Sequence, residues 1–172
     1  MKIGRITLSD RASRGDYADL SGPEIERVVR DRFVDEIDWV RIVLPDEADQ
    51  LAAALRRLAD EEHCHLIITT GGTGPMPRDV TPEATRTVLE KELPGFGEAM
   101  RRASFATVPT SILSRATAGT RGTSLIVNLP GRPAAIAVCL APLLPAIAEA
   151  IDHLAGFRPQ LAPSGVVCAP VS

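Results

Sequence analysis

Cysteine and histidine, which supply many metal sites and catalytic nucleophiles, are scarce in this sequence. Its 172 residues include three cysteines and three histidines. Cys64, Cys139 and Cys168 are odd in number and form no Cys-x-x-Cys pair, so the sequence indicates neither a disulfide framework nor a cysteine-rich zinc site. Cysteines of this kind fit a reducing compartment, so we expect the protein in the cytoplasm.

Long apolar runs and an excess of one charge are also absent. No window approaches the roughly 20 apolar residues of a membrane span, and the first residues lack the pattern of a signal peptide. Lysine and arginine total 19 against 22 aspartates and glutamates, which gives a net charge of −3. This balance argues against a surface built to bind nucleic acid. We therefore expect no membrane and no nucleic-acid partner.

The sequence has enough apolar side chain for one core. Hydrophobic residues make up 45% of the chain. A chain of this length buries roughly 70% of the surface that its unfolded form exposes, and its length is typical of one domain. We predict a single domain over residues 1–157, followed by a proline-rich C-terminal tail over residues 158–172.

Short apolar segments alternate with helical patterns, which is typical of βαβ units wound into a mostly parallel sheet. The expected strands are residues 3–8, 39–44, 66–70, 117–121 and 124–129. The expected helices are residues 21–32, 49–62, 82–89, 97–104 and 133–154. Thr81 is the expected N-cap of the third helix, and residues 117–121 are expected to form one short antiparallel edge strand. The pattern predicts an α/β fold.

Ligands of an open α/β sheet bind at the carboxyl ends of its strands. The loops that leave those ends are residues 9–13, 45–46, 69–79 and 128–131, and they are rich in glycine, hydroxyl and carboxylate groups. Residues 69–74, Thr-Thr-Gly-Gly-Thr-Gly, follow a buried strand and offer closely spaced backbone N–H donors, which suit phosphate oxygens. A tight turn is the alternative interpretation of the same glycines.

Several familiar sites are excluded. Neither of the two lysines follows a glycine, so the chain has no P-loop. Gly72-Thr73-Gly74 is followed by Pro75-Met76-Pro77 and not by a helix, which excludes the dinucleotide-binding fingerprint. His63 and His65 enter a strand at its amino end and His153 ends the last helix, so Ser-His-Asp or Cys-His catalysis lacks candidates.

Two aspartates, Asp46 and Asp79, stand at the ligand edge. Taken singly, Asp46 could cap the following helix and Asp79 could stabilise the turn before Thr81. Together, beside a glycine loop, they can hold a magnesium ion that bridges phosphates. Such a site suits phosphoryl or nucleotidyl transfer, because a phosphate nucleophile is already anionic and needs no general base.

Eight motifs follow one another in order within residues 2–156. They are Ser-Asp-Arg-Ala-Ser (9–13), Leu-Pro-Asp-Glu (44–47), Thr-Thr-Gly-Gly-Thr-Gly-Pro (69–75), Arg-Asp-Val-Thr-Pro-Glu-Ala-Thr (78–85), Pro-Gly-Phe-Gly-Glu (94–98), Val-Pro-Thr (108–110), Ile-Leu-Ser-Arg (112–115) and Asn-Leu-Pro-Gly (128–131). This set resembles the MogA/MoaB family of molybdenum cofactor biosynthesis proteins. The segments 9–13 and 112–115 favour its MogA branch.

The resemblance implies a three-layer α/β/α fold and a homotrimer. For the MogA branch it implies adenylyl transfer from ATP to the terminal phosphate of molybdopterin, with magnesium, which gives adenylylated molybdopterin and pyrophosphate. It also implies a possible hand-over of the product to a molybdenum-insertion protein.

The resemblance assigns site residues by position. Its functional aspartates fall on Asp46 and Asp79, which would be catalytic and would position magnesium and molybdopterin. The residues expected to bind substrate are Gly71, Gly72, Thr73 and Gly74 at the nucleotide phosphates, Ser9 and Asp10 in the same pocket, Asn128, Pro130 and Gly131 at the adenylate, and Ser111, Ser114 and Arg115 at the molybdopterin end.

Two alternatives to the enzyme stay open. One is a molybdopterin-binding carrier or scaffold, like MoaB, that shares the fold and does no chemistry. Tight pterin binding without pyrophosphate release would distinguish it. The other is a pocket for a different nucleotide-sugar or pterin phosphate, because one fold can serve several ligands.

Overall fold

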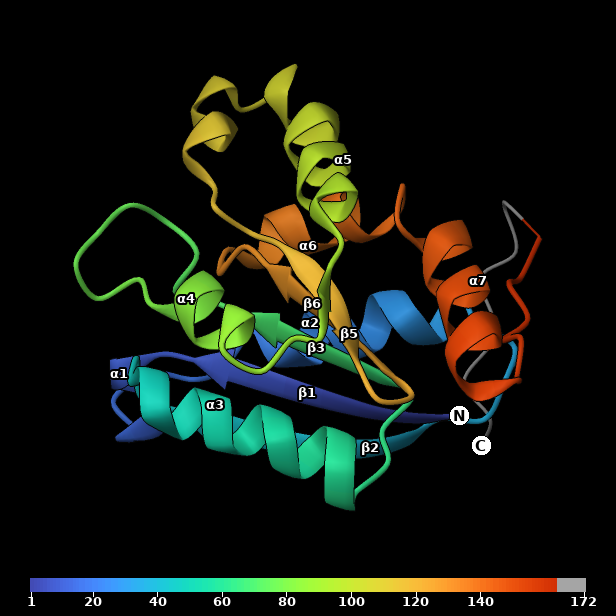
Figure 1. Ribbon diagram of the computed structural model, residues 1–172. Helices are drawn as coiled ribbons and strands as arrows, with labels where there is room; N and C mark the ends of the chain where they lie inside the picture. The colour runs from blue at the N-terminus through green and yellow to red at the C-terminus, as the bar shows by residue number, and fades with distance from the viewer. Residues whose placement is uncertain (164–172) are drawn as a thin grey trace.

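The chain folds around one six-stranded sheet (Figure 1), in a computed structural model that describes residues 1–163. The strands are β1 (Lys2–Leu8), β2 (Asp38–Leu44), β3 (Leu66–Thr70), β4 (Lys91–Glu92), β5 (Ala118–Arg121) and β6 (Ser124–Leu129), in the spatial order β2-β1-β3-β6-β5-β4. Strands β2, β1, β3 and β6 are parallel neighbours, while β5 and β4 add antiparallel pairs. The predicted α/β class with a mostly parallel sheet is confirmed.

Helices cover both faces of the sheet and complete a three-layer arrangement (Figure 1). They are α1 (Asp10–Ser13), α2 (Ser21–Arg30), α3 (Ala48–Arg56), α4 (Thr81–Arg86), α5 (Pro94–Phe105), α6 (Pro133–Leu140) and α7 (Leu144–Ala155). A π-helical turn, η1 (Arg57–Glu61), extends α3, and a 3-10 turn, η2 (Pro109–Leu113), follows α5.

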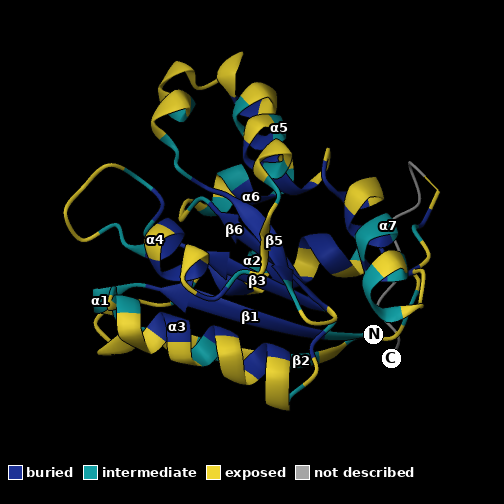
Figure 2. Cartoon of the chain, in the orientation of Figure 1, coloured by how far each residue is buried: buried dark blue, intermediate teal, exposed yellow. Residues whose placement is uncertain are grey.

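Two apolar cores lie on opposite faces of the sheet because successive side chains of a strand point to opposite sides. Along β3, Leu66 and Ile68 join α2, α5, α6 and α7 in one core, while Ile67 joins α3 and α4 in the other. The central strands are buried on both faces, as Figure 2 shows in dark blue. Each fully buried Leu or Ile side chain contributes roughly 1.5–3 kcal/mol.

The single helix predicted over residues 133–154 is wrong. The chain forms α6 and α7 instead, and their axes differ by 67°. Pro142 cannot donate the backbone hydrogen bond that would continue α6, and Pro145 lies in the first turn of α7, where proline is favourable. The continuous apolar pattern concealed this break.

The antiparallel edge also differs in detail from the prediction. Strand β5 matches the predicted strand and is antiparallel to β6. The two-residue β4 pairs with its outer side, so β5 is not itself the edge. Too few residues form β4 to leave a pattern in the sequence.

The described part of the predicted tail packs on the domain. The backbone N–H of Val34 donates to the carbonyl of Gln160 at 2.9 Å, and that of Ala162 donates to Arg32 at 2.9 Å. Residues 164–172, which hold the rest of the predicted tail and Cys168, lie outside the described residues. Within residues 1–163, no single helix has the length and apolar composition needed to cross a membrane. Helices α6 and α7 meet these two criteria only when they are counted together as a bent pair.

A buried ion network ties β1 to α2. Arg5 of β1 donates from Nε to Glu26 at 2.8 Å and from Nη1 to Asp19 at 2.7 Å. The side chains of Arg5 and Glu26 are only 9% and 7% exposed. Burial raises the pKa of Glu26, but hydrogen bonds from Arg41, Arg5 and Arg30 outweigh it and lower this pKa to about 2. The network fixes the loop before α2 against the sheet.

The substitution Glu26→Gln is expected to lower the free energy of unfolding at pH 7 by about 3 kcal/mol, because it removes one of the two carboxylates that offset the buried Arg5 charge and leaves only Asp19. The folded pKa of Glu26, about 2, lies below its ordinary value of 4.5. The stabilisation is therefore complete above about pH 4.5 and is lost as the pH falls towards about 2. Urea denaturation of both proteins at pH 7 and pH 3.5 tests this. If the difference in free energy of unfolding between wild type and Glu26→Gln were the same at both pH values, the result would contradict this prediction.

Candidate active site

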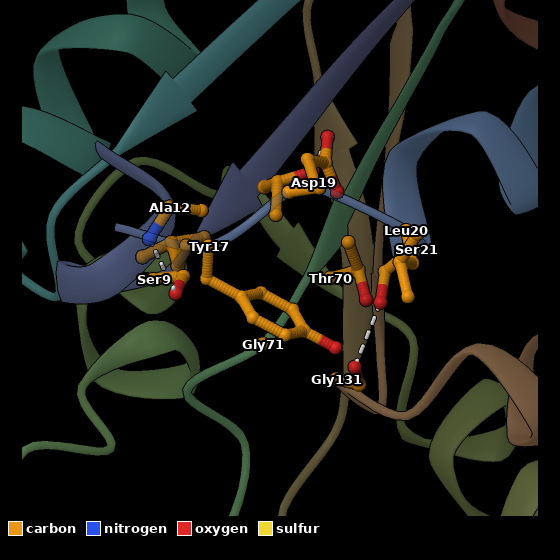
Figure 3. Close-up of a pocket in the computed structure, with 12 residues that line it drawn as sticks. Ser9, Ala12, Tyr17, Asp19, Leu20, Ser21, Thr70, Gly71 and Gly131 are labelled. Atoms are coloured by element: carbon orange, nitrogen blue, oxygen red, sulfur yellow. Dashed lines mark hydrogen bonds between the residues drawn. The ribbon is translucent and has the colours of Figure 1, made fainter. Parts of the chain in front are cut away.

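A cavity of 140 Å³ opens at the carboxyl ends of β1 and β3 (Figure 3). It is lined by Thr7, Leu8, Ser9, Ala12, Tyr17, Ala18, Asp19, Leu20, Ser21, Thr70, Gly71 and Gly131. The chain proceeds from β1 to β2 on one side and β3 lies on the other, so this is the point where strand order reverses. An open α/β sheet binds its ligands at such a point.

Asp10 and Asp46 lock the ends of β1 and β2 together. The backbone N–H of Asp10 donates to Asp46 Oδ2 at 3.1 Å, and that of Asp46 donates to Asp10 Oδ1 at 3.0 Å. Ser9 is the N-cap of α1, and its hydroxyl accepts from the N–H of Ala12 at 3.1 Å. The structure thus brings together three of the residues expected at the ligand edge.

Burial and the surrounding charges and hydrogen bonds shift the pKa values of these two carboxyl groups in opposite directions. Burial raises the pKa of Asp46, and the nearby negative charges of Asp10 and Asp79 add to this effect, while the Asp10 N–H and the Arg78 charge oppose it. The hydrogen bond from the Asp46 N–H lowers the pKa of Asp10, and Arg78 lowers it further. Asp46 is therefore the carboxylate of this pair that gains more from a nearby cation.

Residues 71–80, here called the glycine loop, begin with close backbone packing. Gly71 has φ +98°, and a Cβ there would lie 2.3 Å from the carbonyl oxygen of Leu8. A Cβ on Gly131 would lie 3.1 Å from the Cα of Gly71. These contacts leave room for backbone only and bring the glycine loop and the segment after β6 to one edge.

Thr81 anchors the glycine loop from the start of α4. Its hydroxyl donates to the carbonyl of Gly71 at 2.8 Å, and its N–H donates to that of Gly72 at 3.0 Å. The predicted N-cap role of Thr81 is therefore wrong: Val80 is the N-cap, without a side-chain bond. The Thr81 hydroxyl bonds to a carbonyl of the glycine loop and does not cap a backbone N–H of α4.

Asp79 and Arg115 hold the far part of the glycine loop. Asp79 Oδ2 accepts from the N–H of Met76 at 2.9 Å, which is the turn-stabilising role considered from the sequence. Arg115 donates from Nε to the Gly74 carbonyl at 2.8 Å and from Nη2 to the Asp79 carbonyl at 2.7 Å, and it pairs with Glu83. The guanidinium of Arg115 thus braces the loop in this structure.

The other residues expected at the molybdopterin end lie beside Arg115. Ser111 lies in η2, and its hydroxyl donates to the Arg101 carbonyl at 3.4 Å. The Ser114 hydroxyl accepts from the N–H of Ala116 at 3.4 Å. The N–H of Arg115 donates to the Thr73 carbonyl at 2.9 Å, which joins this segment to the glycine loop.

The segment after β6 reaches the site through its backbone. Asn128 is fully buried, and its Nδ2 donates to the hydroxyls of Thr69 and Thr85 at 3.0 Å each. The carbonyl of Pro130 accepts from Thr70 at 2.7 Å, and that of Gly131 accepts from Ser21 at 2.8 Å. In this structure Asn128 lies beneath the site, and Gly131 lines the cavity.

Several cavity residues were missed from the sequence, above all Tyr17 and Asp19. Asp19 accepts from Thr7 at 2.9 Å and from the N–H of Gly22 at 2.8 Å. The guanidinium of Arg11 lies over the ring of Tyr17, with Arg11 Cζ 5.0 Å from the centroid of that ring. The available signal was composition: the chain has one tyrosine, and it stands in a polar loop after β1.

The histidines lie away from this edge, as predicted. His65 Nδ1 accepts from the backbone N–H of Lys2 at 3.1 Å, at the amino ends of β1 and β3. His153 is near the end of α7 and contacts Glu149 at 3.1 Å. Cys64 and Cys139 are buried, and burial raises the pKa of both thiols.

A preformed metal cage is absent from residues 1–163, where no group of three or more His, Cys, Asp or Glu side chains is arranged to hold an ion. Magnesium does not require one, because it commonly binds one or two carboxylates and completes its shell with substrate phosphates and water. The partly buried Asp46, with Asp10 and Asp79 nearby, offers hard oxygen donors of this kind. The donor set fits magnesium brought with a nucleotide.

The chain is similar to proteins of molybdenum cofactor synthesis. Residues 4–149 match the family described as a probable molybdopterin binding domain. A molybdopterin adenylyltransferase of Helicobacter pylori is 48% identical over 92% of this chain and 90% of that protein. The Escherichia coli K12 protein of the same name is 46% identical over 79% of this chain and 70% of that protein. A crystal structure of the molybdopterin biosynthesis enzyme MoaB from Thermus thermophilus superposes with a TM-score of 0.85. It is 38% identical over 92% of this chain and 99% of that chain.

The substitution Gly71→Ala is expected to destabilise the protein by about 3 kcal/mol, because it combines a left-handed backbone with a clash against the Leu8 carbonyl. Gly95→Ala is the matched control, since a Cβ there meets nothing within 4 Å. Chemical denaturation should show a large loss for the first variant and almost none for the second. Equal stability of the two variants would contradict the close backbone contact.

Proposed function

Because the chain belongs to the family of probable molybdopterin-binding domains, we propose that it is a molybdopterin adenylyltransferase of the MogA branch, acting in molybdenum cofactor biosynthesis. One observation carries the proposal. In a chain similar over almost its full length to proteins of that name, a backbone-lined glycine loop and the carboxylates of Asp10, Asp46 and Asp79 meet at one sheet edge.

The reaction needs positioning more than acid–base chemistry. An oxygen of the terminal phosphate of molybdopterin attacks the α-phosphorus of ATP, and the bond between that phosphorus and the α,β-bridging oxygen breaks. Pyrophosphate leaves with the electron pair, and the product is adenylylated molybdopterin. The attacking phosphate is already anionic, so the absence of a histidine from this edge is no obstacle.

Gly71, Gly72, Thr73 and Gly74 would hold the nucleotide phosphates. The backbone N–H groups of Gly72, Thr73 and Gly74 would be the donors, because that of Gly71 donates to the Leu129 carbonyl at 3.3 Å. The carbonyls of these four residues are taken by Thr81 and Arg115, which fixes the path of the loop. Donors fixed in this way need no reorganisation when charge develops on phosphate oxygens. Ser9 and Asp10 would line the same pocket.

Asp46 and Asp79 would be the catalytic carboxylates and would hold magnesium. When bound, magnesium would supply positive charge that offsets the charge developing on the phosphates. Asp46 is fixed by the N–H of Asp10, and Asp79 by that of Met76. Each therefore keeps its direction without help from the ligand.

The two ends of the substrate site are assigned by position. Asn128, Pro130 and Gly131 would form the adenylate end, where Asn128 acts from beneath by holding Thr69 and Thr85. Ser111, Ser114 and Arg115 would form the molybdopterin end. Arg115 pairs with Glu83, and a phosphate would replace that carboxylate.

A molybdopterin carrier without catalytic activity is the second candidate. The bond of Asp79 to Met76 favours it, because a carboxylate that only stabilises a turn would do no chemistry. Pterin binding without pyrophosphate release separates the two functions.

The cellular setting follows the reaction. Buried reduced thiols at Cys64 and Cys139 suit the cytoplasm. The adenylylated product would pass to a molybdenum-insertion protein.

Three copies of the chain would form a homotrimer. The side chains of Phe105, Val108, Ile112 and Leu113 are exposed together around the end of α5 and η2, which project from the sheet in Figure 1. Exposed apolar side chains gathered in this way are typical of a protein interface. We assign subunit contacts to this surface.

Pyrophosphate release from magnesium-ATP tests the enzyme directly. Release should require molybdopterin, and Asp79→Asn should reduce it by at least about 100-fold while keeping most of the pterin affinity. The asparagine can still accept from Met76, so the loop should remain folded. Asp60→Asn is the control, because Asp60 lies at the opposite edge, paired with Arg121. Equal turnover in Asp79→Asn and wild type would exclude a catalytic role for Asp79.

Sedimentation equilibrium at micromolar concentration should give three times the 18.3 kDa of one chain. Ile112→Glu places a charge in the apolar surface, where Ile112 is 63% exposed in the single chain, and should shift the mass towards 18.3 kDa. A wild-type mass of 18.3 kDa would contradict the trimer. A trimer that tolerates the charge would contradict the interface.

A further inference from the structure

Arg78 is an arginine of the glycine loop, and within residues 1–163 its side chain makes hydrogen bonds only to carboxylates. Its Nη2 donates to Asp10 Oδ1 at 2.8 Å and to Oδ2 at 2.9 Å, and its Nη1 donates to Glu47 at 3.0 Å. Its side chain is 58% exposed. The guanidinium therefore reaches from the loop to the ends of β1 and β2, across the face open to solvent.

Arg78 differs in this respect from Arg115, the other arginine of the loop region. Arg115 is fixed by the carbonyls of Gly74 and Asp79, which a ligand cannot replace without moving the backbone. The partners of Arg78 are side chains: that of Glu47 is exposed and that of Asp10 is partly exposed. Ion pairs open to solvent contribute about 1 kcal/mol or less, and more where the arginine binds both carboxylate oxygens, as it does on Asp10. Arg78 can thus exchange these side-chain partners for another anion that offers two oxygens, while the backbone of the loop stays in place.

The charge at this edge makes such an exchange useful. Asp46 lies near the carboxylates of Asp10 and Asp79, and these neighbours help to raise its pKa. Arg78 offsets the charge of both Asp10 and Asp46, and Arg14 adds to this effect at Asp10. A polyphosphate adds several negative charges and needs donors of its own. A guanidinium presents a rigid fork of N–H groups that matches phosphate oxygens as well as it matches carboxylates.

We propose that Arg78 binds the β- and γ-phosphates of the nucleotide, and then the departing pyrophosphate, by exchanging Asp10 and Glu47 for phosphate oxygens. The inference rests on the proposed adenylyl transfer, in which pyrophosphate is the leaving group. No covalent bond forms at Arg78. The released Asp10 carboxylate becomes free to face the cation that accompanies the nucleotide.

A purely structural role for Arg78 makes the opposite prediction for one variant. Glu47→Gln weakens the hold on Arg78, and the Glu47 side chain makes no other hydrogen bond among residues 1–163. If Arg78 only ties the loop down, loosening it should weaken ligand binding. If Arg78 contacts phosphate, removal of its competitor should strengthen binding.

Calorimetric titration with inorganic pyrophosphate in excess EDTA isolates this contact from the metal and from turnover. Arg78→Met should weaken pyrophosphate binding about tenfold, as expected for the loss of one charge-assisted contact, and Arg78→Lys should recover part of the loss. Glu47→Gln should bind pyrophosphate more tightly than wild type. Arg86→Met is the matched control, because Arg86 is similarly exposed and paired with Glu92; it should bind as wild type does.

Wild-type affinity in Arg78→Met, or weaker binding in Glu47→Gln, would overturn the proposal. So would an equal loss in Arg86→Met, which would mean that only net charge matters. Thermal melts of each variant, expected to match wild type, exclude unfolding as the cause. Pyrophosphate release by the wild type, assayed in parallel, tests the adenylyltransferase assignment separately from the role of Arg78. If the wild type releases no pyrophosphate, the adenylyltransferase assignment fails. If it does, but Arg78→Met binds pyrophosphate as wild type does, only the proposed role of Arg78 fails.

Discussion

The candidate site depends on a close approach of backbone to backbone at Gly71. The ends of β1 and β3 and the segment after β6 meet there, with Leu8 on one side and Gly131 on the other. No side chain fits between these backbone segments, so backbone groups alone form this part of the site. Every later feature of the site, from the Thr81 anchor to the carboxylates of Asp10 and Asp46, is placed relative to this contact.

The site also separates fixed groups from exchangeable ones. Buried or backbone-bonded groups, such as the Arg5–Glu26 pair and Arg115, define the shape of the edge. Exposed groups, such as Arg78, offset its charge and can be exchanged for a ligand. An adenylyl transfer needs both, because it must align two anionic substrates and then release a third anion.

Much of the fold could be predicted from the sequence, because strands buried on both faces leave continuous apolar runs. Strands β1, β3 and β6 fall within the predicted segments almost residue for residue. The break between α6 and α7 was missed because an apolar pattern hides a change of direction, although Pro142 and Pro145 marked it. The site was predictable where glycines and aspartates follow strands. Tyr17 and Asp19 lie in an irregular loop whose path is set by tertiary bonds to Arg5 and Thr7, and such bonds have no periodic signal.

The central claim is that the α-phosphorus of ATP is transferred to molybdopterin. It is tested most directly by incubating the protein with molybdopterin and ATP radiolabelled at either the α- or the γ-phosphorus, and then separating pterin from pyrophosphate. The account predicts that the α label appears in the pterin product and that the γ label appears only in pyrophosphate. A γ label in the pterin, or both labels remaining in ATP while molybdopterin is bound, would contradict it.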